Sequence, residues 1–542
     1  MKLKREENRG DTTLIEIIIQ REITEIENES FEGCWNLEEI TFLPDSQLKS
    51  IGKNAFRGCK KLRKIIFPDS VENIGISAFE GCESLEKVIF GNNMVHSKND
   101  EAILDSRDKK LHSFLSFRIG NDAFRGCIKL KSIIIPHGVK KISCFRDCRS
   151  LVSITIPDSV EEIGDRAFDS CINLDINPIN ISEHNNIRRI GNFAFNRCAN
   201  LKVQLFDFMF PNLETIGNFA FARCRSLKVI DIPTAVDKIG HNCFTGCDGL
   251  EFINLPLKLK KISICCFSGC KRLHYIQIPD GVDEIGMNAF SGCLTIESIK
   301  IPDSVYEIGK RAFSGCETLK TAILSENLRC VSVGVFYGCF ELESVRLGPQ
   351  IQAIYRYAFY HCSLRNLAND DTDELVIPEN IGFIGEASFY ACRMKKLVVG
   401  KTIIEDYAFS SCENLTSAII GEKTFLIGNF IFGLCKKLLF LSIESNVEMS
   451  GIDIFGSSVK FVGMGECVNN PHNYFANNQN RVGTFKSLKK YNTRNFTSCP
   501  ISHDDFEDGT EIIMTSCGHI FSKESFEMCI DKLRCPMCRA IY

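Results

Sequence analysis

The chain has 542 residues, an apolar fraction of 44% and a formal net charge of −4. These values are typical of a folded protein and not of a disordered one. Basic and acidic residues are interspersed, so we expect no nucleic-acid or membrane partner. No stretch approaches the roughly 20 apolar residues that span a bilayer, and the beginning of the chain, MKLKREENRGDTT, lacks the apolar core of a secretory signal. We therefore expect an intracellular protein, either cytoplasmic or nuclear.

The most regular feature is a phenylalanine followed three residues later by a cysteine. Between Phe31 and Cys435 this pair occurs seventeen times, and in the middle of the chain it recurs every 23 residues. A small apolar thiol that follows an aromatic ring at one repeated position is typical of a packed core. We therefore predict buried, reduced cysteines in a stack of repeats.

Residues 285–307, IGMNAFSGCLTIESIKIPDSVYE, illustrate the repeat. The LxxIxIP part alternates apolar and polar residues like a short strand that ends at proline. The DSV part predicts a turn, and the IGxxAFxGC part suits a short helical or irregular segment. One unit cannot bury its own apolar face, whereas stacked units can. The pattern predicts an α/β repeat solenoid with parallel strands on one face.

The recurring pattern IPDSVxxIGxxAFxGCxxLxxI resembles the BspA-like, or Treponema-type, leucine-rich repeat family. The resemblance covers roughly residues 20–455 and implies a right-handed solenoid that binds partners; it does not imply an enzyme. Family members include surface adhesion proteins. We expect an N-terminal cap over residues 1–22 and a solenoid of about 17 to 18 repeats over residues 23–455.

Several intervals depart from the repeat length. Between Cys82 and Cys127 one coil is expected to be degenerate or looped out, in a polar stretch near residues 97–110. Further insertions are expected around residues 175–186 and in the acidic segment 364–374. Each predicts a surface loop, which could also shape a binding face.

If the strands line a concave face, alternate strand positions point outward to a partner. Phe252 beside Tyr275 is the best candidate anchor, because aromatic side chains are enriched in binding hot spots. The candidate partner face consists of Phe252, Tyr275, Gln277, Lys300 and Arg346.

After Phe455 the repeat fails, and an Asn-rich sequence follows that is typical of turns and linkers. We expect residues 456–496 to form a C-terminal cap and linker, and residues 497–542 to form a small separate domain. This last segment contains a pair Cys-x-His followed after fifteen residues by Cys-x-x-Cys. Three thiolates and one imidazole at this spacing make a closed structural zinc site, which would stabilise a module with so small a core. The predicted ligands are Cys517, His519, Cys535 and Cys538.

The order CPIS…DFEDGTEI…CGHIF…CPMCR resembles a RING finger, the ubiquitin-ligase class with two zinc sites. The resemblance implies that the second site is complete. The residues between its ligand pairs predict a helix, because Ser522 can cap it and Phe526, Ile530 and Leu533 form an apolar stripe. At the first site only Cys499 matches, and Ser502, Ser522 and Ser525 stand at the other three ligand positions. Since a serine hydroxyl is a poor zinc ligand, we expect one zinc per chain. An alternative is an improvised second site with Cys499, His503 and a nearby aspartate.

RING proteins act by positioning a conjugating enzyme and its thioester-linked ubiquitin, without a covalent intermediate. By resemblance, Ile501 and Pro536 match the contacts to the conjugating enzyme, and Arg539 matches the linchpin that bonds both proteins. Cys529 stands where many active members have tryptophan and is expected to be a buried helix residue.

These patterns favour a ubiquitin or ubiquitin-like protein ligase whose solenoid captures the substrate and whose terminal module recruits the conjugating enzyme. The alternative is a non-catalytic interaction scaffold with a degenerate RING. A third hypothesis, a surface adhesion protein, requires an export route and oxidised cysteines.

Overall fold

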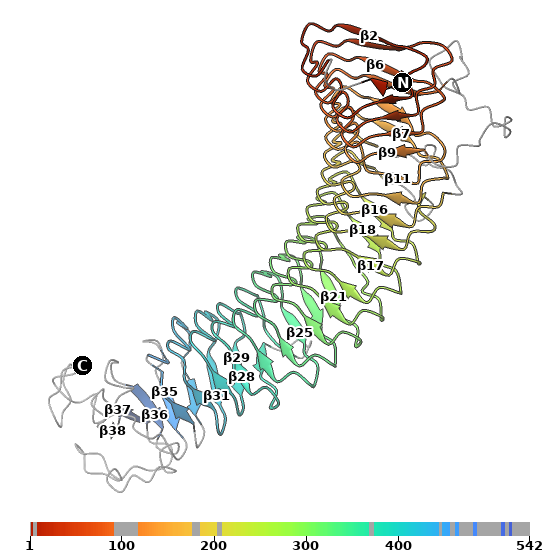
Figure 1. Cartoon of the computed structure of the whole chain (residues 1–542). Coiled ribbons are helices and arrows are strands. Elements are labelled where there is room, and N and C mark those ends of the chain that lie inside the picture. The colour runs from red at the N-terminus through yellow and green to blue at the C-terminus, as the bar shows by residue number, and fades with distance from the viewer. Residues whose placement is uncertain are drawn as a thin grey trace. The chain divides into compact units, whose positions relative to one another are not determined.

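The computed structural model describes residues 2–3, 8–91, 117–175, 185–202, 209–367, 373–438, 440–443, 447–451, 453–455, 461–464, 481–484, 511–514 and 520–522. The chain divides into two units, Met1–Val282 and Asp283–Tyr542. Within each unit, short parallel strands stack side by side, one coil after another (Figure 1).

Unit 1 carries two series of strands along its coils. One series has two-residue strands: β1 (Lys2–Leu3), β3 (Glu25–Ile26), β5 (Ser50–Ile51), β7 (Asn73–Ile74), β9 (Arg118–Ile119), β11 (Lys141–Ile142), β13 (Glu162–Ile163), β14 (Arg189–Ile190), β15 (Thr215–Ile216), β17 (Lys238–Ile239) and β19 (Lys261–Ile262). The other has longer strands: β2 (Glu16–Ile19), β4 (Glu39–Phe42), β6 (Lys64–Phe67), β8 (Lys87–Phe90), β10 (Ser132–Ile134), β12 (Ser153–Thr155), β16 (Val229–Asp231) and β18 (Phe252–Asn254).

Unit 2 repeats the same two series. Its two-residue strands are β20 (Glu284–Ile285), β22 (Glu307–Ile308), β24 (Cys330–Val331), β26 (Ala353–Ile354), β28 (Phe383–Ile384), β30 (Ile403–Ile404), β32 (Phe425–Leu426) and β34 (Glu448–Met449). Its longer strands are β21 (Ser298–Lys300), β23 (Thr321–Ile323), β25 (Ser344–Arg346), β27 (Glu374–Val376), β29 (Lys396–Val399), β31 (Ser417–Ile420), β33 (Phe440–Ile443) and β35 (Phe461–Met464).

Three further strands near the C-terminus form an antiparallel sheet: β36 (Arg481–Thr484), β37 (Glu511–Met514) and β38 (Ile520–Ser522). The first of them falls in the predicted linker, and it pairs with a strand of the predicted terminal domain. The parallel pairing of the solenoid also continues past the predicted end of the repeats, because β33 pairs with β35.

Apolar and polar residues alternate along the strands, as the sequence pattern predicts. In β10 the middle residue Ile133 is buried, while Ser132 and Ile134 on either side face solvent. Proline ends the strand because it has no N–H to donate to the ladder. In the next coil the carbonyl of Pro157 accepts a hydrogen bond from the N–H of Val160 at 3.2 Å, which closes the predicted turn.

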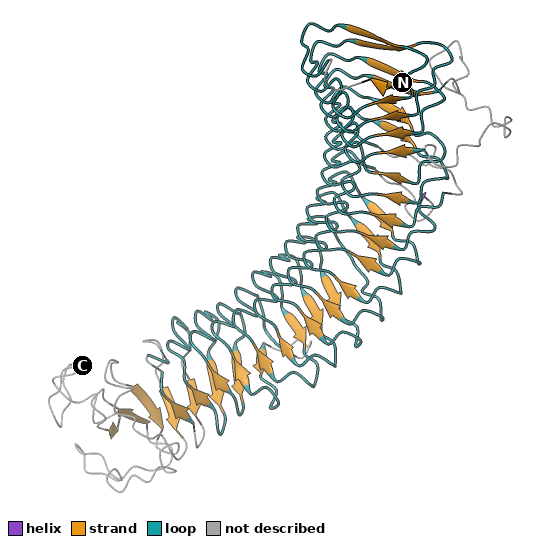
Figure 2. Cartoon of the chain, in the orientation of Figure 1, coloured by secondary structure: helices purple, strands orange, loops and turns teal. Residues whose placement is uncertain are grey.

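The IGxxAFxGC segments that the structure describes are turns, so a helix at these positions was the wrong alternative (Figure 2). The α part of the predicted α/β class is therefore corrected to a solenoid of parallel strands and turns. The reason lies in the backbone. Most repeats place two residues in the left-handed region, as at Asn54 with φ 56° and Gly58 with φ 75°. A right-handed helix cannot pass through such residues.

The core phenylalanines stack ring on ring along each unit. In unit 1, neighbouring ring centroids from Phe31 to Phe267 lie 5.0 to 5.8 Å apart, with nearly parallel planes. In unit 2, the same ladder runs from Phe290 to Phe455 with spacings of 5.2 to 6.2 Å. These rings are nearly inaccessible to solvent, and they form the continuous core that single repeats lack.

The ladder continues directly across the first predicted insertion. Phe79 stacks on Phe124 at 5.5 Å, and β7 pairs in register with β9. The coils of Phe79 and Phe124 are therefore direct neighbours in the stack, and residues 92–116 of the predicted insertion lie outside the described residues. The prediction for residues 364–374 needs a correction, because Leu364 and Asn366 are buried parts of a coil. Only residues 368–372 of that segment lie outside the described residues.

Candidate protein-interaction surfaces

An exposed aromatic row crosses the strands of unit 1. Val229 pairs with Phe252 in the parallel register, and Phe252 forms a bridge to Tyr275 in the next coil. About half of each side chain is exposed, with relative accessibilities of 48%, 47% and 56%. The strand pleat accounts for this exposure, because the following residues Ile230 and Ile253 point into the core. The prediction that Phe252 and Tyr275 face outward side by side is confirmed.

Polar side chains border this row on both sides. Two strand positions further on, Asp231, Asn254 and the exposed Gln277 form a parallel polar row, in which the Asn254 amide donates to the Asp231 carboxylate. Immediately before the row come Lys228, Glu251 and His274, and the His274 ring lies 6.1 Å from that of Phe252. An apolar strip with a hydrogen-bonding border is the anatomy of a protein-binding surface. We call Val229, Phe252 and Tyr275 the strand-face row, and Gln277 belongs to its polar border.

Unit 2 presents its own outward strand positions. Lys300 and Arg346 are exposed on β21 and β25, as predicted. Ser344, which the same alternation placed outward, is instead buried. Its hydroxyl donates to the Asn366 side chain at 2.9 Å, and the next coil covers it. The alternation of the strand thus predicts the direction in which a side chain points. It does not predict solvent exposure, because the neighbouring coil can cover the side chain.

The cysteine ladder serves the core. From Cys59 to Cys270 in unit 1, and from Cys316 to Cys435 in unit 2, the Sγ atom donates to the carbonyl of the phenylalanine one coil earlier, at 2.9 to 3.4 Å. Burial raises the pKa of the thiol at many positions of this ladder, to about 12 at Cys148 and Cys316. The described cysteines are free thiols, and all but Cys265 and Cys330 are buried. The predicted buried, reduced cysteines are confirmed for this part of the chain, and a protonated thiol is a poor nucleophile.

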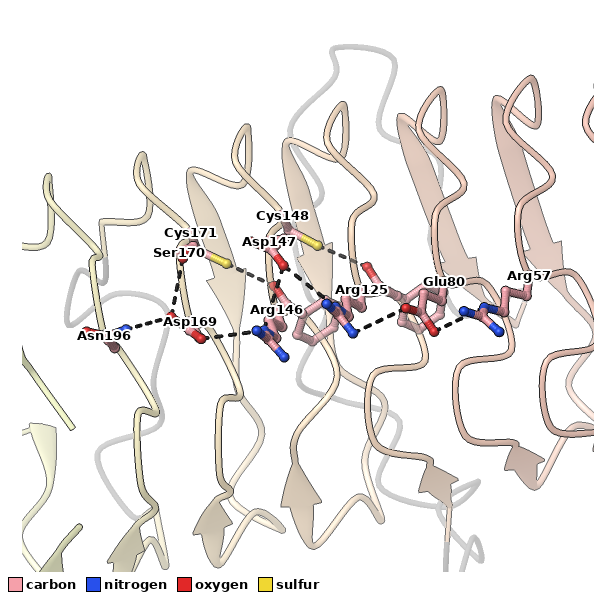
Figure 3. A network of polar contacts seen from close by, with 12 residues as sticks. Arg57, Glu80, Arg125, Arg146, Asp147, Cys148, Asp169, Ser170, Cys171 and Asn196 are labelled. Carbon is pink, nitrogen blue, oxygen red and sulfur yellow. Dashed lines mark hydrogen bonds and ion pairs between the residues drawn. The ribbon is translucent and has the colours of Figure 1, made fainter. Parts of the chain in front are cut away.

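In most repeats the residue after the core phenylalanine lies on the turn surface, and in unit 1 this position carries a ladder of charges (Figure 3). Arg57 lies between Glu32 and Glu80, 3.5 Å from each. Arg125 then joins Glu80 at 3.3 Å, and the ladder ends with these further members: Asp147, Arg146, Asp169 and Asn196. Because the charges neutralise one another across coils, we assign this ladder to coil stacking and not to a ligand.

In unit 2 the same position carries tyrosines, which the sequence pattern did not single out. Tyr337, Tyr360 and Tyr390 stack with ring centroids 4.9 and 4.8 Å apart. The sequence does contain a signal for this stack, since each tyrosine directly follows a core phenylalanine. The recurrence is hard to recognise because additional residues around 368–372 break the 23-residue spacing after Tyr360.

The predicted zinc and conjugating-enzyme residues lie outside the described residues: Cys499, Ile501, Ser502, His503, Cys517, His519, Ser525, Cys529, Cys535, Pro536, Cys538 and Arg539. Ser522 is the last residue of β38, and β37 and β38 flank Cys517 and His519 in the sequence. Over the part of the chain that the structure describes, no cluster of three or more metal-ligating side chains occurs. That part likewise contains no helix long and apolar enough to cross a membrane.

Stacked parallel coils with an LxxIxI strand in each define the class of leucine-rich repeat proteins. A family model described as the BspA type leucine rich repeat region, with six copies, matches residues 9–110, 118–251, 237–365 and 367–481. These matches span most of the chain, which therefore belongs to the BspA-type leucine-rich repeat family.

Solved structures of similar proteins come from several bacteria. A leucine-rich repeat protein of Bacteroides ovatus is 28% identical over 47% of this chain and 72% of its own, with a TM-score of 0.39. A leucine rich cell surface protein of Faecalibacterium prausnitzii is 21% identical over 79% of this chain and 87% of its own, with a TM-score of 0.30. The T. pallidum leucine rich repeat protein is 31% identical over 28% and 70%, with a TM-score of 0.26. No curated protein matches the chain.

Proposed function

We propose that this chain is a protein-interaction scaffold and that its strand-face row binds a partner protein. The observation that carries the proposal is the unbroken exposure of Val229, Phe252 and Tyr275 on three successive coils. Aromatic side chains held by a rigid sheet lose little conformational entropy on binding, so they supply much of the affinity of protein interfaces. The core below them is packed, which keeps the row in place without a partner.

The test is a double variant, Phe252→Ser with Tyr275→Ser. Because both side chains are half exposed, the fold should persist, while partner affinity should fall by about tenfold or more. Immobilised wild-type and variant chains are compared by quantitative mass spectrometry of the proteins that each retains after cross-linking. Tyr306→Ser is the matched control, since Tyr306 is equally exposed but lies outside the strand-face row. An identical set of retained proteins for all three chains would refute the proposal.

A second proposal concerns residues 497–542, which we propose form a RING-like module with one zinc and ubiquitin-ligase activity. The spacing of Cys517, His519, Cys535 and Cys538 supports it, since this is the ligand set of a tetrahedral structural zinc. Ile501, Pro536 and Arg539 stand at the positions that contact a conjugating enzyme in RING proteins. The strand-face row would then hold the substrate. The buried thiols of the solenoid favour a reducing, intracellular compartment for such an activity.

The ligase proposal predicts about one zinc per chain and ubiquitin-chain formation with at least one conjugating enzyme. Arg539→Ala should lower the rate by about tenfold while keeping the zinc, because the arginine positions ubiquitin without ligating metal. Cys535→Ser should lose both zinc and activity. Zinc is measured by atomic emission on the full chain, and activity with a panel of conjugating enzymes. Absence of chain formation with the whole panel removes the ligase proposal and leaves the scaffold proposal untouched.

A further inference from the structure

The turn surface of unit 2 carries an aromatic cluster. In the other repeats, the residue directly after the core phenylalanine is not aromatic. Four tyrosines form it, and we call them the tyrosine surface: Tyr337, Tyr357, Tyr360 and Tyr390. The His361 ring packs edge-on against Tyr360 and Tyr390, at 4.8 and 5.6 Å. In the coils on either side, Ser314 and Ser410 replace the stacked tyrosines, so the cluster has defined ends. The solenoid itself does not require these rings, because serine serves in neighbouring coils.

The packing of these rings determines what they offer to a partner. Tyr337, Tyr360 and Tyr390 are nearly parallel, with interplanar angles of 3° and 11°, so their faces cover one another. Tyr357 packs edge-on against Tyr360 at 5.8 Å. Stacked rings present edges and hydroxyls, whereas a sugar ring would need an open aromatic face.

The hydroxyls of the stack are available to a ligand. The hydroxyl groups of Tyr337, Tyr360 and Tyr390 have no hydrogen-bond partner among the described residues. All three hydroxyl groups are accessible to solvent. A row of phenolic donors therefore faces solvent, spaced by one coil. Such a row suits a ligand with evenly spaced carbonyl acceptors and apolar groups between them.

Acidic side chains lie in the same coils as these rings. Glu386 precedes the turn of Tyr390 and accepts a hydrogen bond from the Tyr357 hydroxyl at 2.7 Å. Glu405 accepts from the N–H of Glu386 at 3.1 Å, whereas the Asp406 carboxylate accepts from the N–H of Asn429 in the next coil at 2.7 Å. Within the described residues none of these three acids forms an ion pair, in contrast to the neutralised ladder of unit 1. Two arginines also lie at this surface: Arg356 interacts electrostatically with the neighbouring Tyr357, and Arg311 covers the Tyr337 ring at 5.9 Å.

We propose that the tyrosine surface binds an extended, proline-rich peptide that carries a basic residue. Polyproline II helices have fully solvated carbonyls, and they dock on aromatic surfaces at low entropic cost. Two coil steps along the stack span roughly 10 Å, and one polyproline II turn spans about 9.3 Å. Equivalent prolines would therefore meet every second coil, and the carboxylates of Glu386 and Glu405, which form no ion pair among the described residues, would receive the arginine or lysine. This surface is separate from the strand-face row and does not depend on the first proposal.

The test is a fluorescence-anisotropy titration of the full chain with a labelled twelve-residue peptide of proline and arginine. We expect saturable binding that weakens with added salt, and about tenfold weaker binding when the arginines are replaced by glutamates. Tyr360→Ser with Tyr390→Ser should weaken binding by about tenfold or more, and Tyr360→Phe by about threefold through loss of one hydroxyl. The serine variants should fold, since Ser314 and Ser410 occupy the same repeat position. Circular dichroism melting checks this, and Tyr337→Ser provides an independent variant.

Phe252→Ser with Tyr275→Ser is the matched control and should leave peptide affinity unchanged. Absence of saturable binding, or unchanged binding by the tyrosine variants, overturns the proposal. So does tighter binding of a linear oligosaccharide than of the peptide, in a parallel titration with cellotetraose. Sedimentation velocity adds a last arm: self-association that is lost in the tyrosine variants would assign the surface to a second copy of the chain instead.

Discussion

Above about pH 9 the free energy of unfolding is expected to fall steeply, because the buried cysteine ladder resists ionisation. Burial raises the pKa of Cys148, Cys247 and Cys316 to about 12 from an ordinary value of 9.0. Below pH 9 both the folded and the unfolded chain carry the proton, so the ladder's contribution is complete. Between pH 9 and 12 only the unfolded chain releases it, so stability is lost as the pH rises.

The size of this effect follows from the number of thiols. At one pH unit above the ordinary pKa, each thiol whose pKa in the folded chain is near 12 lowers the free energy of unfolding by about 1.4 kcal/mol. Many ladder cysteines have pKa values raised by burial in the same direction, so the losses add along a unit. We expect several kcal/mol of destabilisation between about pH 9 and pH 10, far more than surface ion pairs account for.

Urea unfolding followed by circular dichroism between about pH 7 and pH 10.5 measures this dependence under reducing conditions. Cys148→Ala serves as the control. It lowers stability at neutral pH, but it removes one titrating group and should flatten the alkaline slope by about 1.4 kcal/mol per pH unit. A slope that is the same in both chains would show that tyrosine or lysine ionisation, and not the ladder, governs the alkaline transition.

Gly75→Ala is expected to destabilise unit 1 by about 3 kcal/mol or more, because the coils leave no room for a side chain there. A Cβ atom at Gly75 would lie 2.5 Å from the carbonyl carbon of Gly52 and 2.6 Å from the backbone nitrogen of Lys53. Both are backbone atoms of the previous coil and cannot move independently. The N–H of Gly75 also donates to the Ile51 carbonyl at 2.8 Å, so relief of the clash would weaken the stack.

Gly58→Ala is the matched comparison. Its Cβ would lie 3.9 Å from the nearest backbone atom, so the cost comes only from its φ of 75° and should be about 1 kcal/mol. The chain itself places Arg197 and Arg223 in this conformation at the same repeat position. Equilibrium unfolding of the two variants at neutral pH gives the difference. Equal losses would mean that backbone conformation, and not coil contact, sets the need for glycine.

The repeat sequence was sufficient to predict the core and its direction. The Phe and Cys positions, the outward Phe252 and Tyr275, and the parallel strands follow from periodicity, because in a stacked repeat each position meets its own equivalent. The helix at IGxxAFxGC could not be excluded in this way. The residues with positive φ in this segment include asparagine, arginine and tyrosine. Unlike glycine, these residue types do not indicate a positive φ from the sequence.

The candidate surfaces were only partly predictable for a related reason. Exposure at Ser344 depended on Asn366 in the next coil, and Asn366 belonged to a segment that seemed to be an insertion because of its acidic residues. The tyrosine surface depends on stacking between coils of unequal length, which linear spacing obscures. The zinc prediction rests on the sequence alone, since its four ligands lie outside the described residues.

Phe79 stacks directly on Phe124 although more than one repeat length of sequence separates them. Neighbours in the stack are therefore not always one repeat apart in the sequence. The chain between Gly91 and Phe117 is longer than one repeat, yet the described coils on either side of it are direct neighbours. Loop-closure entropy grows only slowly with length, so this point can accept a folded guest domain at modest cost. A fluorescent protein or an affinity module inserted there would be displayed at a defined coil of unit 1. The natural repeat thus provides a ready site for building chimeric binders.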